Sequence, residues 1–234
     1  MWKKFSVGIA GRIACASLVL MMVGCNLPND NAIQSIPVSY VSLYNVSPDA
    51  PDLNIQVDGR PLGYNRFAYG DHTSYLQFYT GNRHFRIGPY GADNVVIDTT
   101  IQLVDNKAYS IFIVDEYNKA SVLVLRDSAS TPAVGKAKIR LVNVSPDAGS
   151  VQLKVKDATG QLIGSKLFKQ ASDFIEVDAK SYNFEVTSEG NNGIHLQVPD
   201  VNLMQGGLYS ILVRGYQTPP TGNTNVLSAE VIVN

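Results

Sequence analysis

Three histidines are the side chains of this sequence best suited to proton transfer or metal binding near neutral pH. His72, His84 and His195 lie far apart, and none belongs to an HxH or HExxH spacing. The chain also contains no GxSxG elbow, no phosphate-binding loop and no cysteine nucleophile. The histidines are therefore expected to be scattered surface residues, and we predict no metal and no cofactor.

One pair of carboxylates is adjacent in the sequence, Asp115 and Glu116. Neighbouring residues of a strand point to opposite faces, and this pair is expected in a turn before residues 117–119. A glycosidase can bring distant carboxylates together without a local motif, so a carbohydrate-active enzyme stays an alternative. The leading prediction is that the protein is not an enzyme and has no catalytic residues.

The amino-terminal residues predict export from the cytoplasm. Three basic residues within the first 12 positions precede an apolar run, residues 13–23, which is too short to cross a bilayer as a helix of about 20 residues. This pattern is typical of a secretory signal peptide, residues 1–24. The letters MVGC, which end at Cys25, resemble the lipobox of bacterial lipoproteins.

The lipobox resemblance implies that Cys25 carries diacylglycerol on its sulfur and becomes the new amino terminus. Each buried methylene contributes about 0.8 kcal/mol, so several acyl chains anchor a protein stably to a membrane. Cys15 would leave with the signal peptide, and no disulfide is then expected. Residues 25–37 are interpreted as the lipidated cysteine and a polar tether. In some bacteria an aspartate directly after the lipidated cysteine is associated with retention in the inner membrane. This chain has Asn26 at that position, which favours the outer membrane. The alternative is an ordinary signal peptide with an incidental cysteine.

The hexapeptide NVSPDA occurs twice in the chain. The similarity between the two segments extends beyond the hexapeptide. VSLYNVSPDA aligns with IRLVNVSPDA, which lies 98 residues later, and a YSI triplet in the first copy aligns with one that lies 100 residues later. The offset grows only in loop regions, as expected if loops absorb insertions. We predict two copies of one domain, residues 38–128 and 136–234, joined by a linker of residues 129–135.

Each copy has the sequence pattern of strands throughout. LNIQV and VQLKV alternate strictly between apolar and polar residues, as half-buried strands do. Asp58-Gly59 is a strong hairpin signal, and Pro61 places the residues after it at a sheet edge or outside the sheet. About seven or eight short strands in each copy favour an all-β fold of two tandem immunoglobulin-like β-sandwich domains. A barrel is the alternative.

The repeated hexapeptide is predicted to be a structural turn. Proline fixes its own φ and disfavours the helical region for the residue before it. Ser47, Pro48 and Asp49 therefore fit a type I turn, which the aspartate stabilises by accepting hydrogen bonds from backbone amides. The second turn is predicted to consist of Ser145, Pro146 and Asp147.

A calcium site is the functional alternative for these turns. Asp49, Asp52 and Asn54, or Asp147 in the second copy, could supply hard oxygen ligands. Six to eight oxygens are needed, however, and the second copy lacks the second carboxylate. The turn is the preferred interpretation.

The aromatic residues are unevenly distributed between the copies. The first holds nine Tyr and four Phe and the second three of each, although both need cores of similar size. Tyr40 aligns with Lys138 and Tyr79 with Asp178, and a position that accepts a charge in one copy is expected to face solvent. A segment rich in turn residues adds three further aromatic residues, Tyr64, Phe67 and Tyr69.

Exposed tyrosines beside polar residues can stack on a sugar ring or anchor a protein partner. The predicted binding residues are Tyr40, Tyr79, Tyr64, Phe67 and Tyr69. The alternative is that several of them cover the interface between the repeats or cap the ends of the sandwiches.

The pattern NVSPDAPDLNIQVDGRPL, followed by FAYGDHTSYLQFYTGNRHFRI, resembles a repeated domain of bacterial surface lipoproteins. That domain is known only as a domain of unknown function, number four-three-nine-seven in its series. The resemblance rests on the SPDAP-like turn, the DG hairpin and the closing aromatic strand. It implies an extracytoplasmic β-sandwich and supplies no catalytic residues. The second copy departs from the pattern in its loops, because no glycine follows Phe168.

These observations predict a lipid-anchored protein of the bacterial cell envelope that acts as a non-enzymatic binding or adhesion module for a glycan or a protein. A structural envelope component that assembles with a membrane complex is the main alternative. The 19 Lys and Arg residues are balanced by 20 Asp and Glu and form no basic stripe, so nucleic acid is not an expected partner.

Overall fold

A computed structural model of the chain describes residues 36–63, 66–127, 130–157, 160–188 and 193–234. The predicted signal peptide, Cys25 and most of the predicted tether lie outside these residues. The described residues form 17 strands and a short 3-10 helix, η1 (Tyr117–Lys119). None of their helical segments is long and apolar enough to cross a membrane.

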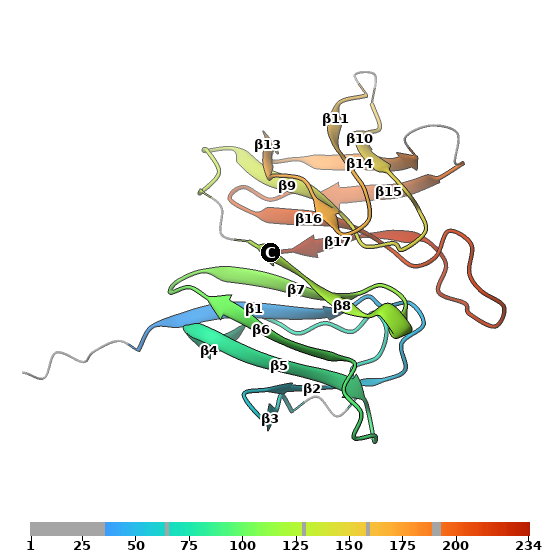
Figure 1. The fold of residues 1–234 in the computed structure, drawn as a ribbon. Coiled ribbons are helices and arrows are strands. Elements are labelled where there is room, and N and C mark those ends of the chain that lie inside the picture. The colour runs from blue at the N-terminus through green and yellow to red at the C-terminus, as the bar shows by residue number, and fades with distance from the viewer. Residues whose placement is uncertain (1–35, 64–65, 128–129, 158–159, 189–192) are drawn as a thin grey trace, which may run out of the picture. The chain divides into compact units, whose positions relative to one another are not determined.

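Repeat 1 forms two four-stranded sheets (Figure 1). Its inner sheet, which faces repeat 2, has the strand order β4-β1-β7-β8, and its outer sheet has the order β3-β2-β5-β6. The strands are β1 (Val38–Asn45), β2 (Leu53–Val57), β3 (Arg60–Pro61), β4 (Leu76–Tyr79), β5 (Gly81–Pro89), β6 (Ile97–Leu103), β7 (Ala108–Val114) and β8 (Ser121–Arg126).

Repeat 2 also forms two sheets. Its inner sheet has the order β12-β9-β16-β17, with β13 also paired to β9, and its outer sheet has the order β11-β10-β14-β15. The strands are β9 (Lys136–Asn143), β10 (Val151–Val155), β11 (Leu162–Lys166), β12 (Gln170–Ala171), β13 (Ile175–Asp178), β14 (Ser181–Ser188), β15 (His195–Asn202), β16 (Leu208–Arg214) and β17 (Ser228–Val233).

The two repeats share one topology. In each, the first strand pairs in parallel with a later strand, β1 with β7 and β9 with β16. The first strand also pairs antiparallel with an edge strand, β4 in repeat 1 and β13 in repeat 2. Every sheet contains strands of one repeat alone. The predicted all-β sandwich fold is therefore confirmed, while its immunoglobulin-like details stay a prediction.

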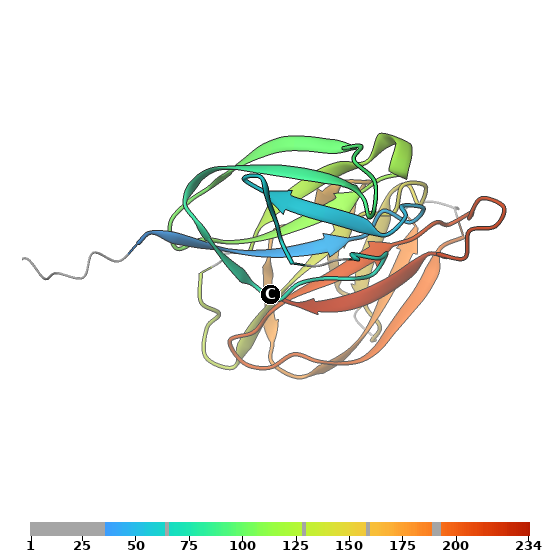
Figure 2. The ribbon, with the colours of Figure 1, turned by 90° about the horizontal axis from the view of Figure 1, so that it is seen from below.

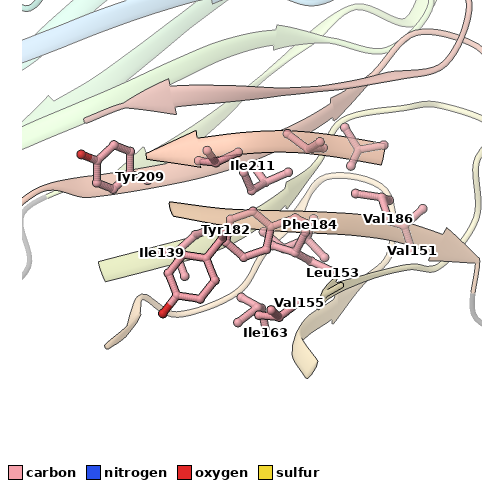
Figure 3. Close-up of a cluster of buried hydrophobic side chains, with 14 of the residues drawn as sticks. Ile139, Val151, Leu153, Val155, Ile163, Tyr182, Phe184, Val186, Tyr209 and Ile211 are labelled. Atoms are coloured by element: carbon pink, nitrogen blue, oxygen red, sulfur yellow. The ribbon is translucent and has the colours of Figure 1, made fainter. Parts of the chain in front are cut away.

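Alternating apolar side chains fill a core between the two sheets of each repeat. In repeat 2, Ile139 and Ile211 of the inner sheet pack with Leu153 and Phe184 of the outer sheet (Figure 3). The core of repeat 1 is built likewise from Val41, Leu43, Ile55, Phe85, Ile87 and Ile111. Complete burial of one such side chain contributes about 1.5–3 kcal/mol, so these two cores account for the stability of the sandwiches.

The predicted DG hairpin joins β2 to β3. Asp58 has φ 51° and Gly59 has φ 76°, so both central residues are left-handed. A two-residue turn of this kind matches the twist of the strands that it connects. β3 contains Pro61 and forms the edge of the outer sheet, as predicted from the missing backbone donor of proline.

A third apolar cluster lies between the inner sheets of the two repeats. It contains Tyr44, Val46 and Phe112 from repeat 1, with Val142 and Leu212 among its members from repeat 2. Residues 36–234 are therefore one compact unit, with four sheets stacked as outer, inner, inner and outer (Figure 1). Strands β1 and β9 are buried on both faces, which explains their nearly continuous burial.

A buried ion pair crosses the same interface. Arg140 of β9 donates from Nη2 to Oδ1 of Asp127, and both side chains are almost wholly buried. Arg140 also donates from Nε to the Ser210 hydroxyl at 2.8 Å and lies over the ring of Phe174. The second carboxylate oxygen of Asp127 accepts from Ser110 at 2.8 Å. This network links the end of repeat 1 to the first strand of repeat 2.

Candidate functional site

The first NVSPDA segment forms the corner after β1. The Ala50 N–H donates to the Ser47 carbonyl at 3.3 Å and closes the turn. The Ser47 hydroxyl donates to the Asp115 carbonyl at 2.7 Å, and Asp49 accepts from the Tyr117 N–H at 2.7 Å. The corner thus ties the end of β1 to the loop that follows β7.

The second NVSPDA segment makes the same ties in repeat 2. The Ser145 hydroxyl donates to the Gly215 carbonyl at 2.6 Å. Asp147 accepts from the Gln217 and Thr218 N–H groups at 2.7 and 2.8 Å. The equivalent bonds in two copies explain why this hexapeptide is identical in both: the serine and the aspartate each hold the loop after the parallel partner strand.

The first corner has an additional role at the interface between repeats. The Pro48 carbonyl accepts from the side-chain amides of Asn223 and Asn225 at 2.9 and 2.6 Å. Burial, followed by the nearby charge of Asp49, raises the pKa of Tyr216 to about 12. The long loop between β16 and β17 therefore reaches across to repeat 1.

Within the part of the chain that the structure describes, the carboxylates and histidines do not gather into a metal site. No group of three or more metal-ligating side chains occurs among the residues that the structure describes. The carboxylate of Asp52, a member of the calcium alternative, lies 3.6 Å from Arg66. His84 and His195 form surface pairs with Asp98 and Glu185, at 2.5 and 3.5 Å.

The structure separates the five predicted binding residues. Phe67 is 1% exposed and belongs to the core of repeat 1, so its prediction as a binding residue is wrong. The turn-rich sequence around it suggested a surface loop, but a backbone bridge to Leu53 draws the ring inward. Tyr69 lies against Arg214 of repeat 2, which fits the interface alternative. Tyr64 lies outside the described residues.

Tyr40 and Tyr79 share one face of the β1–β4 pair. Tyr79 lies opposite Val38 and Tyr40 opposite Gln77, so alternation along β1 puts both rings on the same side. Tyr40 is half-buried, whereas the side chain of Tyr79 is 60% exposed. This is the largest exposed fraction of any tyrosine that the structure describes. Of the predicted residues, Tyr79 is thus the one that presents most of its ring to solvent.

Tyr79 lines a groove of about 610 Å³ at the open side of repeat 1, between β4 and the β2–β3 hairpin. We call it the edge groove. Its lining consists of Val38, Val57, Asp58, Arg60, Pro61, Leu62, Gln77, Phe78, Tyr79 and Arg83. Ligand pockets typically measure 300–1,000 Å³ and combine an apolar lining with a few polar groups, as this groove does.

Two of the charged side chains that line the edge groove, Arg83 and Asp58, form an ion pair. Arg83 donates from Nη1 to Oδ2 of Asp58 at 3.0 Å, and the other oxygen of Asp58 accepts from the His84 N–H. The guanidinium of Arg83 is therefore held beside the groove, while Arg60 is exposed on the hairpin. The arrangement can stack a flat ring on Tyr79 and donate hydrogen bonds to its polar substituents.

Repeat 2 has a different surface at the same place. Lys136 and Asp178 stand opposite each other where repeat 1 has Val38 and Tyr79, and they form an ion pair of 2.7 Å. The hydrogen bond to Lys136 lowers the pKa of Asp178. β11 also packs closely on the inner sheet, because a Cβ at Gly164 would lie 3.1 Å from Ser172.

Sequence reasoning missed Arg60, Arg83 and Leu62 of the groove, since a surface hollow leaves no local motif. It also missed the buried pair of Arg140 and Asp127. The signal for that pair was present, because Arg140 stands between the apolar residues Ile139 and Leu141. A charged residue in a strand buried on both faces needs a partner.

Residues 39–154 match the family described as Domain of unknown function (DUF4397). That segment contains repeat 1 from its second residue on, both NVSPDA corners, strand β9 and all but the last residue of β10. No curated protein matches the chain.

Several solved structures resemble the chain distantly. They include a streptococcal virulence factor that binds α-glucan, with 13% identity, a TM-score of 0.25, and coverage of 74% of this chain and 92% of that chain. A carbohydrate-binding module of Eubacterium rectale in complex with maltoheptaose has 12% identity, a TM-score of 0.25, and coverage of 83% and 96%. A protein of Parabacteroides distasonis assigned to cell adhesion has 11% identity, a TM-score of 0.23, and coverage of 85% and 99%. No function is carried over at these scores.

Proposed function

We propose that the protein is a non-enzymatic, lipid-anchored binding module of the bacterial cell envelope, and that the edge groove of repeat 1 binds a carbohydrate. The observation that carries this proposal is the exposed ring of Tyr79 on the rim of a groove of about 610 Å³. A saccharide presents an apolar ring face and a rim of hydroxyl groups, which match an aromatic platform beside polar side chains.

The polar groups of the groove suit hydroxyl groups. Arg60, Arg83 and Gln77 offer N–H donors, and Asp58 and Gln77 offer acceptor oxygens. The groove contains no candidate nucleophile and no pair of carboxylates, since Asp58 is its one acidic residue. Binding without turnover is therefore the chemistry that this surface supports best.

The membrane attachment rests on the sequence of the lipobox. Cys25 would carry the lipid, and the polar tether would hold the sandwiches off the outer membrane. Labelling of cells with radioactive palmitate should mark the protein, and a Cys25→Ala variant should lose the label. Retention of the label in that variant would contradict lipidation at Cys25.

A glycan array tests the binding proposal with the full chain in mild detergent. We expect binding to one group of saccharides and at least tenfold weaker binding by Tyr79→Ala, because the stacking platform is lost. Tyr90→Ala is the matched control, since Tyr90 is also an exposed tyrosine of repeat 1 but lies outside the groove. Equal loss in both variants, or no binding to any glycan, would refute the proposal.

A further inference from the structure

A second surface of the molecule has the geometry of a strand-binding site. β17 is an edge strand of the inner sheet of repeat 2, paired with β16 on one side alone. A strand at a sheet edge presents a row of unpaired N–H and C=O groups to any chain that can lie beside it. The direction of those groups on β17 follows from its register.

The pairing with β16 determines which residues of β17 point outward. The Asn234 N–H donates to the Leu208 carbonyl at 2.9 Å, and opposite residues of an antiparallel pair alternate between bonded and non-bonded. Ile232 and Glu230 are consequently bonded to β16. The backbone groups of the alternate residues face away from it, and among the described residues they have no backbone partner: Ala229, Val231 and Val233.

A groove of about 410 Å³ runs beside this free edge. Glu230–Val233 form one wall, residues 72–75 of repeat 1 form the other, and Ser42 and Tyr44 lie at its base. Figure 2 shows the segment that leads into β4 running beside β17. We call this hollow the interface groove, because both repeats line it.

The walls of the interface groove are fixed. The Thr73 N–H donates to the Leu43 carbonyl at 3.0 Å, and the Ser42 hydroxyl donates to the Thr73 carbonyl at 2.6 Å. The segment at residues 72–75 is thus held to β1 and limits the space beside β17. Residues 72–75 therefore border the space in which a chain added beside β17 would lie.

β17 lacks the devices that normally protect a sheet edge. It contains no lysine and no proline, and its one charge, Glu230, is paired with Arg214 at 2.8 Å. Val233 is exposed at its end. The edge strand β15 of the outer sheet, by contrast, contains Pro199 and a register irregularity. The chemistry beside β17 therefore favours an uncharged partner strand.

We propose that the interface groove binds an extended, uncharged peptide segment of another protein, rich in β-branched residues, which adds to β17 as a further antiparallel or parallel strand. The backbone groups of Ala229, Val231 and Val233 would supply the hydrogen bonds, and alternate side chains of the peptide would lie over Tyr44 and Ile232. This surface is separate from the edge groove, so one chain could hold a glycan and a protein partner together.

An array of acetylated octapeptides built from Val, Ile, Thr and Tyr tests this inference with the full chain in mild detergent. We expect binding that weakens at least tenfold in Val231→Pro, which removes an outward N–H without breaking a bond to β16. Val233→Lys gives a second disruption at an exposed position that does not depend on proline being tolerated. Hydrogen exchange of the Ala229, Val231 and Val233 amides should slow when peptide is bound.

The matched control is Val124→Pro in β8, the corresponding edge strand of repeat 1. The Asp127 N–H donates to the Ala108 carbonyl, so the N–H of Val124 also points outward, but β8 does not line the groove. Binding should be unchanged in this variant. No binding by any peptide, or equal loss in Val124→Pro, would overturn the inference. A dimer of the full chain that Val231→Pro converts to a monomer would also overturn it, because the added strand would then come from a second copy.

Discussion

The two repeats have the same topology but offer different surfaces at the start of their first strands. In repeat 1 this position pairs Val38 with Tyr79 and borders the edge groove. In repeat 2 it pairs Lys136 with Asp178, and the third strand, β11, closes on the inner sheet. The two repeats thus agree in their corners and cores and differ at this edge, and the binding function that we propose belongs to the groove of repeat 1.

The interface between the repeats shows the same balance of symmetry and divergence. Ser110 bonds to Asp127 after β8, and the equivalent Ser210 bonds to Asn234 after β17, at 2.8 and 2.6 Å. Arg140 has no basic counterpart, since Ser42 occupies its place in repeat 1. The ion pair of Arg140 and Asp127 is thus a feature of the interface that the symmetry of the two repeats does not supply.

Removal of the acidic partner of Arg140 should have the largest effect on stability. Asp127→Ala leaves Arg140 buried and unpaired, which should lower the free energy of unfolding by about 3–5 kcal/mol. Asn234→Ala removes neutral hydrogen bonds at the equivalent place and should cost about 1 kcal/mol. Denaturant titration of both variants measures the difference. Equal losses would mean that the charge has no special role in joining the repeats.

The two corners should respond alike to loss of their serines. Ser47→Ala and Ser145→Ala each leave a carbonyl without its hydroxyl donor, at Asp115 and Gly215, and should cost about 1–3 kcal/mol. Ser74→Ala, at an exposed serine, should change stability by less than about 0.5 kcal/mol. Thermal unfolding of the three variants measures these losses. A loss in Ser47→Ala or Ser145→Ala no larger than that in Ser74→Ala would contradict the structural role of the hexapeptide.

Alkaline pH should weaken the interface because tyrosines are buried there. Burial raises the pKa of Tyr44 and of Tyr75, and Asp127 adds to the effect on Tyr75. The pKa of these tyrosines is higher in the folded protein than in the unfolded chain, where it is near 10. Their contribution to the free energy of unfolding is therefore fully present below pH 10 and is lost as the pH rises through the folded-state pKa. The slope is at most about 1.4 kcal/mol per pH unit for each tyrosine.

Stability measured by urea titration from pH 8 to pH 11.5 would show this decline. Tyr75→Phe removes the ionisable hydroxyl and should reduce the slope above pH 10. An identical slope in Tyr75→Phe and the parent chain would argue against a buried, protonated Tyr75.

The smallest effect on stability should come from exchanging the rim of repeat 1 for that of repeat 2. Val38→Lys with Tyr79→Asp recreates the exposed ion pair, and such pairs contribute only about 0–1 kcal/mol. Glycan binding should be lost in the double variant while the melting temperature changes little. Retained binding would show that the difference between the rims has no bearing on function.

Much of the fold could be predicted because it depends on local patterns. Alternation predicted strands such as β2 and β10, and the DG pair predicted the hairpin after β2. The packing of the two inner sheets against each other could not be predicted in the same way. The sequence does not show whether the side chains of Tyr44 and Phe112 face solvent or the other repeat. Phe67 was misplaced for a related reason: turn residues on either side of it masked a return to the core.

The parallel pairing of β1 with β7 also determines how the molecule resists force. Any pull transmitted through the residues before Val38 acts along the axis of β1, which is bonded to β7 from Tyr40 to Asn45 and to β4 on its other side. All of these bonds bear the load at once, in shear, whereas a hairpin pulled at its open end would unzip one bond at a time. We therefore expect rupture at high force when the chain is stretched from its amino-terminal side in single-molecule measurements.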